Sequence, residues 1–200
     1  MYVLLEGLKG MGADELLKKY HLENSVPVDL DKLTENLGIN IYEVDFTKMT
    51  DYVGKTGEKK ADKMQFLSDV LGILLPMENQ IAIVLKPNLS YHRKRFTIAH
   101  EIDHCCLNDE LKSSHIEFRH SVFSSDIHNQ KEIAANIFAG ELLMLEEAVK
   151  KVCAKFFVPE INAIAKVFQV SVSVASKRLN YLNIPYIHMG DLNYYARHYG

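Results

Sequence analysis

Three residues of one short segment, HEIDH, could do chemistry together: His100, Glu101 and His104. On a helix, residues four apart share a face with their Cβ atoms roughly 5–6 Å apart, so the two imidazoles can bind one zinc ion at about 2.0–2.1 Å. Glu101 then lies beside the metal without binding it, where it can take a proton from an attacking water and pass it to a leaving amine. The HExxH pattern therefore predicts metal-assisted amide hydrolysis.

The five-residue pattern alone also occurs by chance, and its alternative interpretation is a pair of histidines on a solvated helix face. The surrounding sequence favours the metal. The motif stands in an apolar helical stretch that includes Phe96, Ile98 and Ile102, directly after two predicted strands. A buried helix that carries histidines behind a strand is the arrangement a zincin needs.

A catalytic zinc site needs a third protein ligand. The pattern HExxHxxGxxH is excluded because Leu107 and Glu110 occupy its Gly and His positions. The other option is a glutamate from the next strong helix, either Glu132 or Glu141, and at about 100° per residue these two face opposite sides. Glu132 also has a structural alternative, as the third helical residue after a capping Asn129. The residues alone therefore leave the third ligand open.

The elements that must position these residues can be read from periodicity and turn signals. Residues 12–37 read as helical, and INIYEV (39–44) alternates like a strand. Two further strands, 71–76 and 80–86, form a predicted hairpin. Helices are expected from about residue 90 through the motif, at 131–145, and at 159–168 and 173–182 around the turn QVS. Residues 108–128 read as a long loop or as short helices. The predicted order is helix, then a small antiparallel sheet, then more helices. This order is typical of the α+β fold class.

The second hairpin strand, QIAIVLK, could lie at a sheet edge and pair with an extended substrate. Its alternative is internal pairing.

An electrophilic side chain should also stabilise the oxyanion that forms during amide hydrolysis. Candidates by location are His115, His120 and His128, with Tyr194 and Tyr195 as weaker ones. For each of the histidines, the alternative is an ordinary surface position.

Composition sets the class of protein. A chain of 200 residues can bury one sizeable core, and a net charge of −3 gives no basic surplus for nucleic acid. Cys105 and Cys106 are adjacent and Cys153 is the third, so reduced thiols are expected rather than a disulfide framework. No secretory signal or membrane-spanning run is recognised. A cytoplasmic protein without a membrane partner is therefore expected.

Three segments in order, RKRFTIAHEIDH, KEIAANIFAGELLM and IAKVFQVSVSVASKRLNYLNI, resemble the ImmA/IrrE family of metallo-endopeptidases. The resemblance runs from about residue 27 to Ile184. It implies a zincin-like fold of the gluzincin type, with the glutamate of an E-x-x-A-N-x-F-A pattern, here Glu132, as the third metal ligand beside His100 and His104. Two histidines and a carboxylate suit zinc, the better default, or manganese.

Two positions depart from the family pattern. Asp103 stands where the family usually has Gly, and Leu145 stands where a Pro usually follows Leu-Leu-Met. Asp103 could hydrogen-bond a ligating histidine, or it could be a solvated surface carboxylate. HEIDH also occurs in peptide deformylases, but these take a cysteine ligand from upstream of the motif, and this chain has no cysteine before Cys105. That interpretation is rejected.

The resemblance implies a site-specific endopeptidase that cleaves a helix-turn-helix repressor encoded nearby and so derepresses mobile-element or stress-response genes. Two alternatives remain: an anti-repressor that binds without cleaving and uses its metal structurally, and a toxin–antitoxin component. The expected organisation is a metallopeptidase domain at 1–155, a helix-turn-helix-like unit at 156–184 and a tail at 185–200.

The helix-turn-helix-like unit raises the question of direct DNA binding. Its second helix carries only two basic residues, Lys177 and Arg178, with Ser171 as a possible cap at its start. Specific binding to DNA usually requires several phosphate contacts as well as base contacts. We therefore expect a packing element or a surface for the repressor, and do not expect direct DNA binding.

Overall fold

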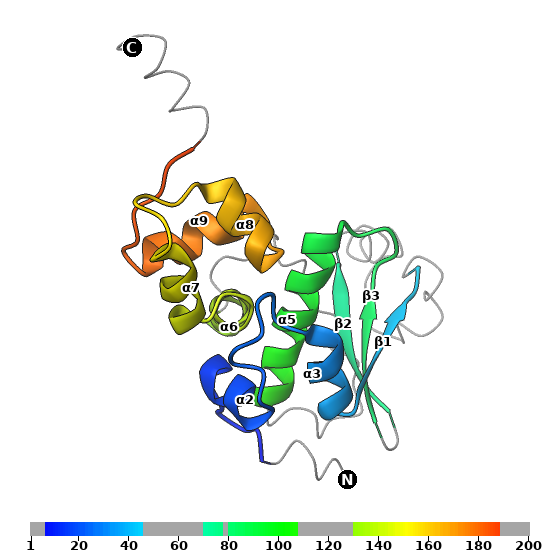
Figure 1. Ribbon diagram of the computed structural model, residues 1–200. Coiled ribbons are helices and arrows are strands. Elements are labelled where there is room, and N and C mark those ends of the chain that lie inside the picture. Colours follow the sequence, from blue (N-terminus) through cyan, green and yellow to red (C-terminus); the bar gives the residue numbers. More distant parts are fainter. Residues whose placement is uncertain (1–6, 46–69, 78–79, 108–129, 189–200) are drawn as a thin grey trace.

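The computed structural model describes residues 7–45, 70–77, 80–107 and 130–188. Within these ranges the fold is α+β, with seven helices and one three-stranded sheet (Figure 1). The elements are α2 (Ala13–Lys19), α3 (Leu30–Asn36), β1 (Ile39–Glu43), β2 (Gly72–Pro76), β3 (Ile81–Leu85), α5 (Tyr91–Leu107), α6 (Gln130–Leu143), α7 (Glu146–Cys153), α8 (Ile161–Phe168) and α9 (Val172–Tyr181).

The sheet has the order β1-β3-β2, and it is mixed. β2 and β3 pair antiparallel, as their short hairpin requires, but β1 pairs parallel to β3. The prediction of an antiparallel sheet is therefore wrong for β1. Alternation within a strand reports which face is buried but not the strand's direction, and the long connection between β1 and β2 allows the parallel arrangement.

Of the two interpretations of QIAIVLK, internal pairing is confirmed and the edge-strand interpretation is wrong. β3 is the central strand of the described sheet, and all five of its residues are buried. The unbroken apolar run IAIVL is typical of a strand that is covered on both faces. The backbone of β3 is thus paired on both sides and cannot receive a substrate strand.

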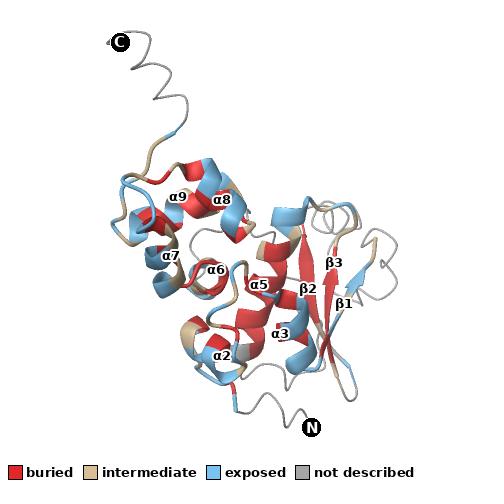
Figure 2. Ribbon diagram, in the orientation of Figure 1, coloured by how far each residue is buried: buried red, intermediate tan, exposed pale blue. Residues whose placement is uncertain are grey.

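Helix α5 contacts both the sheet and helix α6. It lies across β2 and β3 on one side and packs against α6 on the other (Figure 1). Its motif-bearing half is buried, as are the two sheet strands beside it (Figure 2). Ile98, Ala99 and Ile102 supply the apolar face that the sequence predicted. A helix held between a sheet and a second helix has little freedom to move its side chains.

The C-terminal helices continue the same hydrophobic core. Phe168, Ala175 and Leu179 of α8 and α9 belong to one cluster with the residues of α5, α6 and the sheet. The predicted cap is confirmed, since Ser171 Oγ accepts a hydrogen bond from Val174 N at the start of α9. Helix α7 was not predicted; it begins directly after Leu145, two residues beyond the end of α6 at Leu143.

The predicted subdivision at residues 155 and 184 stays a prediction. Residue 187, within the predicted tail, forms a backbone bridge with Glu160 at the start of α8. No helix in the described ranges is both long and apolar enough to cross a membrane.

Candidate metal centre

Three side chains from two helices converge at the interface of α5 and α6. Nε2 of His100 and Nε2 of His104 lie 3.1 Å apart. The carboxylate of Glu132 lies beside both, with one oxygen 3.2 Å from His100 Nε2 and the other 3.6 Å from His104 Nε2. These residues form the one group of potential metal ligands found within the described part of the chain.

This geometry fits a tetrahedral metal ion. Four ligands at about 2.0–2.1 Å from a zinc ion stand about 3.3–3.4 Å from one another. The two histidine nitrogens lie 3.1 Å apart, and the two Glu132 oxygens lie 3.2 Å from His100 and 3.6 Å from His104, so the distances lie on either side of that value. Two imidazoles and one carboxylate are also a donor set of catalytic zinc sites, which leave the fourth position for water or substrate.

Local sequence explains why the ligands meet. His100 and His104 are one helical turn apart, so they share a face of α5. Glu132 lies in the first turn of α6, and Ala135 and Ala139 follow it on the same face of that helix. Both alanines are fully buried, and their small side chains allow α5 and α6 to approach closely.

The site is buried, and the burial affects His100. Burial lowers the pKa of His100, but the hydrogen bond to Glu132 and the charges of Glu101 and Glu132 outweigh this effect, so the pKa is raised overall. The side chain of Asn136 acts in the same direction. The carboxylates thus favour positive charge at this point, which is also what a bound cation supplies.

Glu101 lies next to this group on α5 and is 2% exposed. Its position depends on Gly72 of β2. A Cβ on residue 72 would lie 2.5 Å from Cγ2 of Thr97 and 3.2 Å from Oε1 of Glu101. Only glycine therefore lets β2 lie this close to the turn of α5 that carries Glu101.

The structure also distinguishes between the two candidate third ligands, Glu132 and Glu141. Glu141 points away from the histidines and pairs with Arg178 of α9 at 3.1 Å. The alternative role of Glu132 after a capping Asn129 falls outside the described residues, because Asn129 is not among them. The oxyanion candidates His115, His120, His128, Tyr194 and Tyr195 also lie outside the described residues.

Asp103 is buried, at 1% exposure, so its interpretation as a solvated surface carboxylate is wrong. Sequence reasoning also missed the roles of Gly72 and Asn136. An isolated glycine in a strand often marks a close backbone approach, and that signal was available at Gly72. Asn136 is four residues after Glu132, on the same face of the helix, and it contributes to the raised pKa of His100.

Comparison with known proteins agrees with this geometry. A search of curated proteins finds no match to the chain. A family model described as the IrrE N-terminal-like domain, a peptidase family, matches residues 34–180. The matched range covers most of the chain and includes the HExxH helix, Glu132, helix α8 and all but the last residue of α9. This chain belongs to the family of IrrE N-terminal-like peptidase domains.

Proposed function

We propose that this chain is a zinc-dependent endopeptidase in which His100, His104 and Glu132 hold the metal and Glu101 is the general base. The observation that carries the proposal is the convergence of these three ligand atoms beside Glu101, in a chain that belongs to a peptidase family. The donor set and the separations between the ligand atoms support zinc.

The residues divide the chemistry between them. A zinc ion at this site would supply Lewis acidity for the scissile carbonyl and lower the pKa of water. Glu101 takes the proton of the attacking water and delivers it to the leaving amine nitrogen. Burial of Glu101 supports this role, because a poorly hydrated carboxylate is a better proton acceptor.

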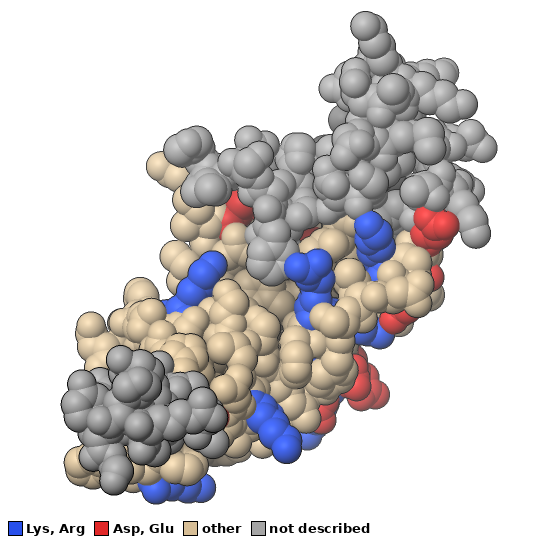
Figure 3. Space-filling model, turned by 90° about the horizontal axis from the view of Figure 1, so that it is seen from above, with Lys and Arg blue, Asp and Glu red and all other residues tan. Residues whose placement is uncertain are grey.

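The proposed substrate is a helix-turn-helix repressor whose gene lies near the gene for this chain. The resemblance of the three sequence segments to the ImmA/IrrE family supports this substrate class. Direct DNA binding by the chain itself is not proposed. Of the two basic residues on α9, Arg178 is buried and bonded within the protein. On the face seen in Figure 3, the Lys and Arg side chains stand apart from one another.

The test is incubation of the zinc-loaded chain with the repressor of the neighbouring gene. The wild type should cut the repressor at one site. Glu101→Gln keeps the size of the side chain but removes the base, so it should keep zinc and partner binding while cleavage falls by about 10²–10⁴-fold. Glu147→Gln makes the same chemical change at an exposed position on α7 and should cleave normally.

Two results would count against the proposal. If Glu101→Gln cut as fast as the wild type, the general base would be assigned wrongly. If the wild type bound both zinc and repressor without cutting, the chain would be a non-cleaving anti-repressor.

A further inference from the structure

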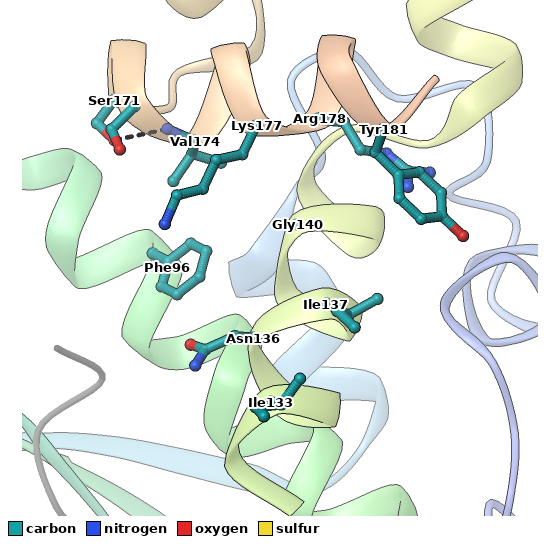
Figure 4. Close-up of a pocket in the computed structure, with 11 residues that line it drawn as sticks. Phe96, Ile133, Asn136, Ile137, Gly140, Ser171, Val174, Lys177, Arg178 and Tyr181 are labelled. Carbon is teal, nitrogen blue, oxygen red and sulfur yellow. Dashed lines mark hydrogen bonds between the residues drawn. The ribbon is translucent and has the colours of Figure 1, made fainter. Parts of the chain in front are cut away.

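A groove of about 370 Å³ lies between α6, α9 and the first half of α5 (Figure 4). Its walls are mainly apolar and include Phe96, Ile133, Ile137, Val174 and Tyr181. Ile133, Ile137 and Tyr181 are 42%, 51% and 65% exposed among the described residues. Large apolar side chains gathered at an exposed hollow are typical of a binding site.

The groove and the candidate metal centre adjoin each other along α6. Asn136 lines the groove and lies one helical turn after Glu132, on the same face of α6. Ile133 directly follows Glu132, and Gly140 lies further along the same helix, about 12 Å from Glu132 at 1.5 Å per residue. An extended peptide covers that distance in about four residues at roughly 3.3 Å each. A chain being cut at the metal can therefore place a nearby side chain in the groove.

Gly140 is a second, independent observation. It lies inside α6, where glycine is less favourable than every residue except proline. Its backbone does not require glycine, because its φ is not positive. Packing does not require it either, since a Cβ at residue 140 would meet no described atom within 4 Å. The missing side chain leaves open space in the groove.

The groove also carries a positive charge. Lys177 reaches from α9 toward Phe96 across the groove (Figure 4). Arg178, the other cation in the lining, is already paired with Glu141. Lys177 makes no ion pair or hydrogen bond with any residue in the described ranges. Its charge is available to a carboxylate of a bound peptide.

We propose that this groove recognises the substrate next to the scissile bond. It takes a bulky apolar side chain within about four residues of that bond, and Lys177 selects an acidic residue beside this side chain. The inference rests on the proposed peptidase function and gives it a substrate class: a flexible segment that pairs an apolar residue with an acidic one.

The test measures cleavage preference in the zinc-loaded full chain. The probe is a synthetic library of unstructured peptides in which bulky apolar, small, acidic and basic residues are sampled at each position, with the cut sites read by mass spectrometry. The wild type should prefer a bulky apolar residue within about four positions of the cut and an acidic residue next to it.

Variants of Gly140 then fill the groove with side chains of increasing size. Gly140→Leu should lower the ratio of kcat/KM for peptides with a bulky apolar residue to that for peptides with alanine by about tenfold or more. Gly140→Ala should lower it less. Lys177→Glu should replace the acidic preference with a basic one. Val167→Phe adds bulk at an exposed position of α8 outside the groove and should leave both preferences unchanged.

The outcomes separate this inference from the proposed function. If zinc-loaded wild type cuts the repressor but no peptide in the library, only the groove assignment fails; if it cuts neither, both fail. If it cuts without an apolar preference, or Gly140→Leu leaves that preference in place, only the groove assignment fails. If Gly140→Leu lowers the melting temperature and slows the cleavage of all peptides equally, another segment of the chain fills the groove and the inference is overturned.

Discussion

Two glutamates on one helix, Glu132 and Glu141, show how position gives like side chains different roles. Glu132 lies beside two histidine nitrogens, while Glu141 pairs with Arg178 of α9. Their spacing places them on opposite faces of α6. The carboxylate that faces α5 is the candidate metal ligand, and the carboxylate that faces α9 is part of the packing of the C-terminal helices.

This difference predicts the metal content of two alanine variants. Glu132→Ala should weaken zinc binding by more than about 100-fold, because changing even a residue outside the ligand set costs about 10–100-fold. Glu141→Ala is the matched change on the same helix and should keep zinc at the wild-type level. Zinc per chain is measured by mass spectrometry, and circular dichroism checks that both variants are folded. Full zinc in Glu132→Ala would show that the third ligand is another residue.

Close contact between β2 and α5 sets the position of the proposed general base. Gly72 lies against Thr97 and Glu101, one helical turn apart on α5. The strand and the helix pack tightly here, and dense packing transmits a local change in volume to neighbouring atoms. Glu101 is therefore held by the backbone of β2 as well as by its own helix.

Gly72→Ala should consequently affect catalysis more than metal binding. The added methyl group overlaps Thr97 Cγ2, so β2 and α5 must move apart at an expected cost of about 1–3 kcal/mol in unfolding free energy. Cleavage should slow while zinc stays bound. Thr97→Ser removes Cγ2, so the double variant should recover part of both losses. Stability is measured by urea unfolding and activity on the repressor; a Gly72→Ala variant with wild-type values of both would contradict this account.

One buried cation, Arg178, links α9 to the end of α6. Arg178 donates a hydrogen bond from Nε to the carbonyl oxygen of Met144 and pairs through its guanidinium with Glu141. It is 7% exposed, while its neighbour Lys177 is exposed and lies over the groove. Adjacent basic residues on this helix thus have different environments.

Arg178→Ala should destabilise the protein by about 2–3 kcal/mol, less than a fully buried pair because the Glu141 side chain is partly solvated. Lys177→Ala should change the unfolding free energy by no more than about 0.5 kcal/mol. Urea unfolding of the two variants measures the difference. Equal effects would show that the Arg178 contacts do not hold α9 in place.

At the scale of the whole molecule, the metal centre joins the two halves of the chain. His100 and His104 lie on the helix that covers the sheet, and Glu132 begins the helix that leads to α7, α8 and α9. A metal ion bound between α5 and α6 would cross-link these halves in the folded state. Metal binding should therefore contribute to global stability as well as to chemistry.

Zinc at about 100 times its dissociation constant should add about 2.7 kcal/mol to the unfolding free energy. For a chain of this length, that corresponds to a rise of roughly 5–11 °C in melting temperature. A chelator should reverse the rise, and His104→Ala should show none of it. Thermal unfolding with and without zinc provides the measurement. A wild type that is insensitive to zinc would contradict metal binding between the two helices.

Local pattern determined much of this protein from sequence alone. The HExxH spacing indicated the metal chemistry, apolar periodicity placed the helix that carries it, and the cap at Ser171 follows from side-chain chemistry within one turn. These features depend on residues a few positions apart, whose geometry a helix fixes. The family resemblance added Glu132 where the residues alone left the third ligand open.

Only the tertiary structure decided the rest, because it depends on residues far apart in the chain. The parallel pairing of β1, the central position of β3 and the burial of Asp103 all follow from how the elements pack. The contact of Gly72 with Glu101 and the groove around Gly140 likewise need partners on another element. Periodicity shows which face of an element is buried, whereas the neighbour that covers it is chosen by packing across the whole molecule.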